Sequence, residues 1–212
     1  MVDVNYFDLG LWKFPHEIEM ILHDVVPNLT DINFKIYGFE AHPIYAMTVQ
    51  NRYQDIDFIE ILNLAISDHN GQEKLFESSG TGLGCSIFKS KNNVSRYHYD
   101  VDSVLFSDWV LKNVSNFKDA INIVKINIEG AELYFYRDIV KADIRKYINI
   151  FAGYHYHDIL KVKELEDYVD EYFKLIKNNN IEIHNYCGEV QGYPNVDMTS
   201  LIKKEIEKEK NG

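Results

Sequence analysis

The sequence predicts a Rossmann-like α/β fold in which a mostly parallel central sheet carries helices on both faces. Short apolar segments typical of strands alternate with segments whose apolar residues follow helical spacing. The runs 58–66 and 121–128 are largely apolar, as expected for strands buried on both faces. With 212 residues, 46% of them hydrophobic, the chain suits a single domain spanning 1–212 with a sizeable core.

The beginning of the chain is expected to alternate strand and helix. Val2–Leu9 alternates and then reaches Gly10, which predicts a first strand that ends in a turn. Apolar residues at helical spacing within 18–25 predict a helix. Phe34–Phe39 is the second expected strand, and Pro43 stands where a proline in the first turn would begin another helix.

The middle of the chain combines strand signals with an irregular stretch. We expect 58–66 to be a buried strand, followed by a hairpin turn at Asn70-Gly71 and a returning strand at 74–77. Residues 78–100 are rich in Ser, Gly, Asn and Lys without a clear period, which indicates a mobile loop or lid. A mainly helical approach to the next strand is expected over 101–111.

The second half of the chain repeats the alternation. Strands are expected at 121–128, 147–152 and 181–186, with a helix at 131–140 after the first of them. Apolar residues within 165–176 form an amphipathic stripe that predicts a further helix.

Composition excludes several classes of function. The 22 basic and 33 acidic residues give a net charge of −11, and no basic stripe is present, so we expect no nucleic-acid partner. No segment is apolar and long enough for a membrane span, and no signal peptide is found. Two cysteines make neither a disulfide framework nor a zinc pattern. We expect a reduced, cytoplasmic protein, either monomeric or oligomeric.

Polar residues follow the predicted strands at the positions where a ligand site is expected. In open α/β sheets, ligands bind beyond the carboxyl ends of the strands, near the point where the strand order reverses. The residues found at those positions are Asp8 and Gly10, Glu40, Ser67 and Asp68, Asn127 and Glu129, and His155 and His157.

Each of these positions has a functional and a purely structural interpretation. Gly10 would let the backbone approach a ligand closely, or form an ordinary turn. Glu40 could accept hydrogen bonds from both ribose hydroxyls, or stabilise the start of the helix at Pro43. Glu129 suits a polar active site, or the first turn of a helix. His155 and His157 point the same way in an extended chain and suit a general base or a metal, or simply polar surface.

Taken in order, four motifs resemble the FkbM family of methyltransferases. They are Tyr6–Gly10, Tyr37–Pro43, Leu64–Gly71 and Val124–Glu132, and the resemblance covers roughly residues 2–157. It implies the class I methyltransferase version of the Rossmann-like fold and S-adenosyl-L-methionine as cofactor. We expect no bound metal. The implied reaction is in-line transfer of a methyl group to a hydroxyl of a small molecule or a glycan.

The resemblance also implies roles for individual residues. The turn from Asp8 to Trp12 would surround the methionine part, Glu40 would hold the ribose, and Ala65 to Asp68 would line the adenine. Asn127 and Glu129 would lie near the methyl group. The expected cofactor-binding residues are Asp8, Gly10, Leu11, Trp12, Glu40, Ala41, Ser67, Asp68 and Asn127. The expected catalytic residues are Glu129, His155 and His157.

Three departures from the family pattern keep other functions open. Lys13 stands near the place of a second glycine, Asn127 replaces an aspartate, and His155 replaces a glutamate. These changes are compatible with a binding module that keeps the cofactor cleft but has lost catalysis. A nicotinamide-dependent oxidoreductase is disfavoured, because a pyrophosphate needs more glycines after the first strand than Gly10 alone.

Overall fold

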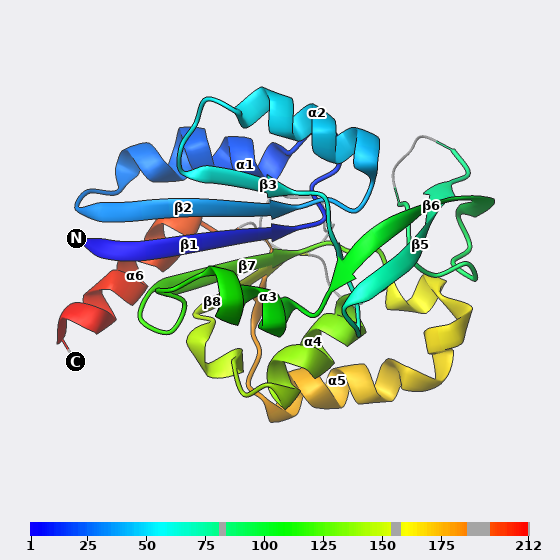
Figure 1. The fold of residues 1–212 in the computed structure, drawn as a ribbon. Coiled ribbons are helices and arrows are strands. Elements are labelled where there is room, and N and C mark those ends of the chain that lie inside the picture. Colours follow the sequence, from blue (N-terminus) through cyan, green and yellow to red (C-terminus); the bar gives the residue numbers. More distant parts are fainter. Residues whose placement is uncertain (81–83, 154–157, 186–195, 212) are drawn as a thin grey trace.

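The computed structural model describes residues 1–80, 84–153, 158–185 and 196–211. Its main sheet has six strands in the order β3-β2-β1-β7-β8-β9, and every neighbouring pair is parallel (Figure 1). The strand order reverses between β1 and β7. The strands are β1 Val2–Leu9, β2 Ile32–Phe39, β3 Ile59–Leu62, β7 Ile121–Ile126, β8 Ile150–Gly153 and β9 Ile183–His184. The expected parallel α/β sheet is confirmed.

Helices cover both faces of this sheet, as the sequence predicts. One face carries α1 and α2 with α6, and the other carries α3, α4 and α5. These helices are α1 His16–Met20, α2 Pro43–Tyr53, α3 Phe106–Asn113, α4 Glu132–Lys141, α5 Val169–Asn178 and α6 Met198–Asn211. The π-helical turn Ile21–Val25 and the 3-10 turn Val26–Asn28 extend α1, and further 3-10 turns span Arg145–Tyr147, Ile159–Lys161 and Lys163–Tyr168.

Alternation along the central strands explains why both faces are packed. In β1, Val4 and Tyr6 are buried against the α1, α2 and α6 layer, whereas Phe7 and Leu9 are buried against the α3, α4 and α5 layer. Strands β2 and β7 divide their apolar residues in the same way. Within the described residues, every helix is too short or too polar to cross a membrane.

A smaller three-stranded sheet lies beyond the end at which β1 finishes (Figure 1). It contains β4 Ala65–Ile66, β5 Gly71–Ser78 and β6 Val94–Val104, in the order β4-β6-β5. Strand β6 runs antiparallel to β5 and parallel to β4. This sheet builds one wall of the pocket described below.

The smaller sheet corrects three expectations for the middle of the chain. The run 58–66 is not one strand, because Asn63 leaves the main sheet and its amide donates to the carbonyls of Glu40 and Ala41. The strand after Asn70-Gly71 pairs with β6 and not with 58–66. The segment 94–104 is a strand, so 78–100 is not irregular throughout and 101–104 is not helical.

Candidate functional site

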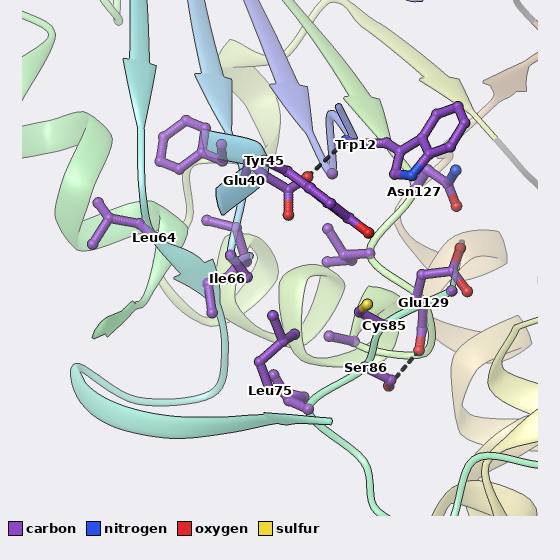
Figure 2. Close-up of a pocket in the computed structure, with 18 residues that line it drawn as sticks. Trp12, Glu40, Tyr45, Leu64, Ile66, Leu75, Cys85, Ser86, Asn127 and Glu129 are labelled. Atoms are coloured by element: carbon purple, nitrogen blue, oxygen red, sulfur yellow. Dashed lines mark hydrogen bonds between the residues drawn. The ribbon is translucent and has the colours of Figure 1, made fainter. Parts of the chain in front are cut away.

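A pocket opens at the carboxyl ends of β1, β2 and β7, where the strand order reverses (Figure 2). The smaller sheet and the segment 84–87 close it on the side away from the main sheet. Its lining is mostly apolar and includes a few polar side chains. The lining residues are Gly10, Trp12, Phe39, Glu40, Ala41, Tyr45, Leu64, Ala65, Ile66, Leu75, Gly84, Cys85, Ser86, Ile87, Asn127, Ile128, Glu129 and Ala131.

The turn after β1 requires glycine at position 10. Gly10 has a φ of +90°, and a Cβ there would lie 1.9 Å from the Asn127 carbonyl oxygen. The two strand ends are held at this separation by the Asn127 N–H, which donates to the Leu9 carbonyl at 2.9 Å. Trp12 follows with a φ of +58°, which turns the chain toward the end of β2. Gly10, Trp12 and Asn127 therefore reach the pocket, as expected.

Glu40 lies at the end of β2 with its carboxylate fixed by backbone donors. Its Oε2 accepts the Trp12 N–H at 2.6 Å, and its Oε1 accepts the His42 N–H at 2.7 Å. Burial raises the pKa of Glu40, while these two hydrogen bonds oppose the rise. An ionised carboxylate offers about four acceptor sites. Each oxygen therefore keeps capacity for a ligand hydroxyl, and Ala41 lies beside it in the same wall.

Asp8 and Leu11 take supporting positions and are absent from the pocket lining. Asp8 is fully buried and pairs with the Lys125 ammonium at 2.8 Å, which also donates to the Gly10 carbonyl at 2.8 Å. Glu17 of α1 lies 3.3 Å from the same ammonium. Burial raises the pKa of Asp8 to about 7; Lys125 opposes this and Glu17 adds to it. This buried cluster of charges therefore supports the turn after β1 without lining the pocket.

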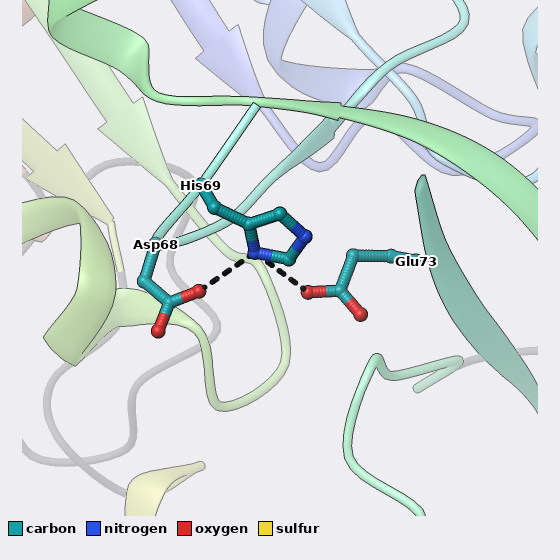
Figure 3. A group of neighbouring side chains, drawn as sticks. All are labelled: Asp68, His69 and Glu73. Carbon is teal, nitrogen blue, oxygen red and sulfur yellow. Dashed lines mark hydrogen bonds and ion pairs between the residues drawn. The ribbon is translucent and has the colours of Figure 1, made fainter. Parts of the chain in front are cut away.

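Ser67 and Asp68 also lie outside the pocket lining, although the preceding β4 residues Ala65 and Ile66 belong to it. Ser67 is buried and donates to Glu73 at 2.7 Å. Asp68 accepts from exposed His69 at 2.9 Å, and this hydrogen bond raises the pKa of His69 (Figure 3).

The ligand atoms of Asp68, His69 and Glu73 lie within 4.8 Å of one another. His69 is paired with both carboxylates, and the arrangement is explained by these exposed contacts between opposite charges. The cluster therefore carries no assignment of a metal site.

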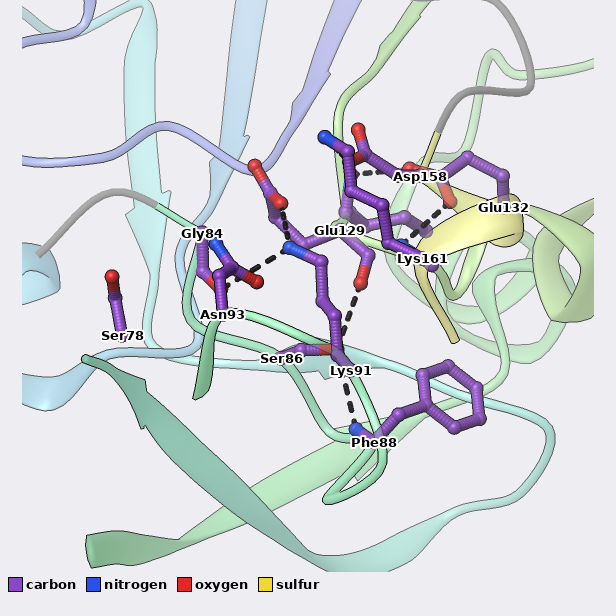
Figure 4. Close-up of polar contacts among 12 residues, drawn as sticks. Ser78, Gly84, Ser86, Phe88, Lys91, Asn93, Glu129, Glu132, Asp158 and Lys161 are labelled. Atoms are coloured by element: carbon purple, nitrogen blue, oxygen red, sulfur yellow. Dashed lines mark hydrogen bonds and ion pairs between the residues drawn. The ribbon is translucent and has the colours of Figure 1, made fainter. Parts of the chain in front are cut away.

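Glu129 reaches the pocket from the turn between β7 and α4, with a φ of +57°. Its carboxylate pairs with the ammonium of Lys91, and its carbonyl accepts the Ser86 hydroxyl at 2.7 Å (Figure 4). Burial and the nearby Asp158 raise the pKa of Glu129, while Lys91 opposes the rise. Carboxyl groups shifted in this way gather at functional sites.

Glu132 supports this turn from the first turn of α4. Its carboxylate accepts the N–H groups of Ile128 at 2.9 Å and Gly130 at 2.8 Å. Burial, followed by the charge of Asp158, raises its pKa to about 7. Glu132 thus lies in the first turn of α4 and fixes the backbone of the β7–α4 turn.

The predicted bases His155 and His157 lie outside the described residues. The structure adds several pocket residues that sequence reasoning missed: Tyr45, Leu64, Leu75, Cys85, Ser86 and Ile87. Tyr45 reaches into the pocket from α2, two residues after the proline that begins this helix (Figure 2). Its place in the first helical turn after β2 was the available signal for it.

Comparison of the chain with family models, curated proteins and solved structures found no match. The fold and the pocket consequently rest on the geometry described above, and the family resemblance stays a prediction.

Proposed function

We propose that the protein is an S-adenosyl-L-methionine-dependent O-methyltransferase that acts on a hydroxyl of a small molecule or a glycan. The observation that carries the proposal is the position of Glu40. Its buried carboxylate lies at the end of β2, in a pocket at the reversal of strand order, where Rossmann-like proteins bind ribose. The two backbone donors orient both oxygens before any ligand binds.

The other pocket residues fit this cofactor. Gly10 lines the pocket at the end of β1, and Leu64, Ile66 and Leu75 provide apolar surface for an adenine ring. The buried Trp12 Nε1 has no hydrogen-bond acceptor among the residues that the structure describes. A buried donor without a partner is costly, and a ligand carboxylate beside the turn would satisfy it. We therefore assign the methionine part to the Gly10–Trp12 turn.

The start of α1 does not suit the pyrophosphate of a dinucleotide. Pyrophosphates bind at helix N-termini through free backbone N–H groups and the positive end of the helix dipole. Here Pro15, which has no N–H, precedes α1, and Glu17 and Glu19 occupy its first turn. Glu17 lies near the Lys125 ammonium and Glu19 is paired with Arg52, so the start of α1 offers a pyrophosphate no free donor. The nicotinamide alternative is disfavoured on the same ground.

The chemistry divides between cofactor and protein. The bound cofactor supplies a methyl group on a positively charged sulfur. The pocket holds the two reactants in place, which lowers the barrier by removing their freedom to separate and tumble. Glu129 lines the same pocket and offers a carboxylate that can accept the proton of the attacking hydroxyl.

Calorimetry with S-adenosylhomocysteine, using NAD⁺ as the control ligand, tests the cofactor class. We expect saturable binding of S-adenosylhomocysteine alone. Glu40→Gln should weaken it roughly 10- to 150-fold, since hydrogen bonds to a charged group contribute about 1.5–3 kcal/mol. Glu60→Gln, at a half-exposed glutamate on β3, is the matched control and should bind normally. Unchanged affinity in Glu40→Gln, or no binding by the parent protein, would contradict the proposal.

Binding without transfer has its own interpretation. If labelled S-adenosyl-L-methionine binds but no methyl group reaches any of a panel of sugars and phenolic alcohols, the binding module without catalysis becomes the better description. The Asn127 and Lys13 departures would then account for the lost activity.

A further inference from the structure

Lys91 places a buried ammonium at the edge of the proposed active site. Its side chain has no exposed surface, and its Nζ contacts the Glu129 carboxylate and the Gly84 carbonyl, the latter at 3.2 Å (Figure 4). An unpaired charge is costly to bury, so the opposite charge of Glu129 is what makes this position tolerable. The pair joins residues 38 positions apart in the sequence.

The main chain fixes Lys91 from both sides. Ser86 exchanges two backbone hydrogen bonds with Phe76 of β5, at 2.8 and 3.1 Å. Beyond Lys91, the Asn92 N–H donates to the Lys161 carbonyl at 3.1 Å, and Lys91 itself forms a β-bridge with Val162. The segment 84–93 is therefore held between the smaller sheet and the 3-10 turns after β8. The ammonium has a defined position that does not depend on the ion pair alone.

Glu129 depends on Lys91 for its hydrogen bonding. Among the described residues, Lys91 is the sole donor to this carboxylate. Asp158 adds negative charge nearby, but Asp158 is itself paired with Lys161 at 2.6 Å. The charged and titratable groups that interact with Glu129 are Lys91, Asp158, Lys161, Glu132 and Cys85. Lys91 is thus the nearest balancing charge in a surplus of carboxylates.

We propose that Lys91 is a positioning residue for methyl transfer: it keeps Glu129 ionised and aimed into the pocket, where Glu129 accepts the proton of the acceptor hydroxyl. The inference rests on the proposed function. In this step the hydroxyl oxygen forms a bond to the methyl carbon as the carbon–sulfur bond breaks. The sulfur keeps that electron pair and becomes a neutral thioether, and the hydroxyl proton passes to the Glu129 carboxylate.

The protein alone supplies the first test, through titration of Glu129 followed by NMR. Carboxyl carbons of labelled glutamate are observed, and the Glu129 signal is identified by its loss in Glu129→Gln. We expect Lys91→Met to raise the midpoint of the Glu129 titration by at least about one pH unit, a tenfold gain in proton affinity. Lys161→Met removes a neighbouring lysine that is paired with Asp158, and should change that affinity less than about threefold.

A second measurement protects the test against a variant that does not fold. In the parent protein, the Lys91 Nζ nitrogen signal should shift with the same midpoint as Glu129, whereas that of Lys161 should not. The proposal would be overturned if the Glu129 titration were unshifted in folded Lys91→Met. It would also be overturned if the Lys91 signal did not change as Glu129 titrates.

Cofactor binding by the Lys91 variant tests whether Lys91 acts on Glu129 or only maintains the pocket. Lys91→Met should bind S-adenosylhomocysteine within about threefold of the parent protein, because Lys91 is absent from the pocket lining. A loss of cofactor binding equal to that of Glu40→Gln would show that Lys91 merely maintains the pocket wall, and would refute the positioning role. If the parent protein binds no S-adenosylhomocysteine, the proposed function fails while the titration still reports whether Lys91 controls Glu129.

Discussion

Gly10→Ala should separate the ends of β1 and β7 and destabilise the protein by about 2–4 kcal/mol. An alanine with the φ of +90° found at Gly10 is strained, at a cost of roughly 1–2 kcal/mol. Its Cβ would lie 1.9 Å from the Asn127 carbonyl oxygen, whereas real Cβ contacts are almost never below 3.0 Å. The strand ends must therefore move apart by about 1 Å, since 3.0 minus 1.9 is 1.1.

The movement weakens hydrogen bonds that converge on this turn. The Asn127 N–H donates to the Leu9 carbonyl and the Lys125 ammonium donates to the Gly10 carbonyl, at 2.9 and 2.8 Å. Each bond contributes about 1 kcal/mol net, so weakening both adds about 1–2 kcal/mol to the cost of the strain. The same displacement moves Trp12, so S-adenosylhomocysteine binding should weaken at least about tenfold, or about 1.4 kcal/mol.

Urea denaturation followed by circular dichroism measures the loss of stability. Gly80→Ala is the matched control, because a Cβ at Gly80 meets no atom within 4 Å. It should change the free energy of unfolding by less than about 0.5 kcal/mol. Equal effects of the two substitutions would show that the close approach of β1 and β7 does not constrain position 10, and would refute the reasoning.

Two further predictions concern the buried charges. Lys125→Met leaves Asp8 and Glu17 without their shared cation and should lower the free energy of unfolding by about 3–5 kcal/mol at about pH 8. Part of this stability should return at about pH 5, because Asp8 takes up a proton. Urea midpoints at both pH values measure the effect, and a loss of stability that is independent of pH contradicts it. Because burial raises the folded-state pKa of Glu132 from 4.5 to about 7, its ionisation removes stability as pH rises through that window, by up to about 3 kcal/mol. Glu132→Gln should make the fall smaller by this amount, while Asp8, whose pKa is also raised to about 7, still contributes to it. The variant also loses one backbone hydrogen bond at low pH. Parallel stability–pH curves for variant and parent would be incompatible with the shift.

Local patterns were sufficient to predict the main sheet. The strand β7 is largely apolar and buried on both faces, whereas β1 alternates apolar and polar residues before the turn at Gly10; both patterns are visible without tertiary information. The smaller sheet could not be predicted in the same way. Strand β6 is largely polar because much of it is exposed, and its partner β5 is identified only by a register that tertiary packing selects. A polar segment with a Gly- and Ser-rich beginning therefore predicted a loop where part of a sheet forms.

The same distinction applies to the candidate site. Gly10, Glu40 and Asn127 lie at fixed short distances after predicted strands, so the topology of a parallel sheet brings them to one pocket whatever the rest of the chain does. Strand ends also predicted Asp8, Ser67 and Asp68, but a position after a strand does not reveal which way a side chain points. Asp8 is directed to the α1 side, where Lys125 neutralises it.

The role of Lys91 could not be predicted from any local sequence pattern. It is one lysine in an aperiodic segment, and nothing in its neighbours distinguishes it from a solvated surface residue. Its burial follows from three contacts made by distant elements, β5, the β7–α4 turn and the segment around Val162, which together fix the path of 84–93. A residue that positions another can thus be found only after the path of the chain is known, whereas the residue it positions, Glu129, was found from the strand that it follows.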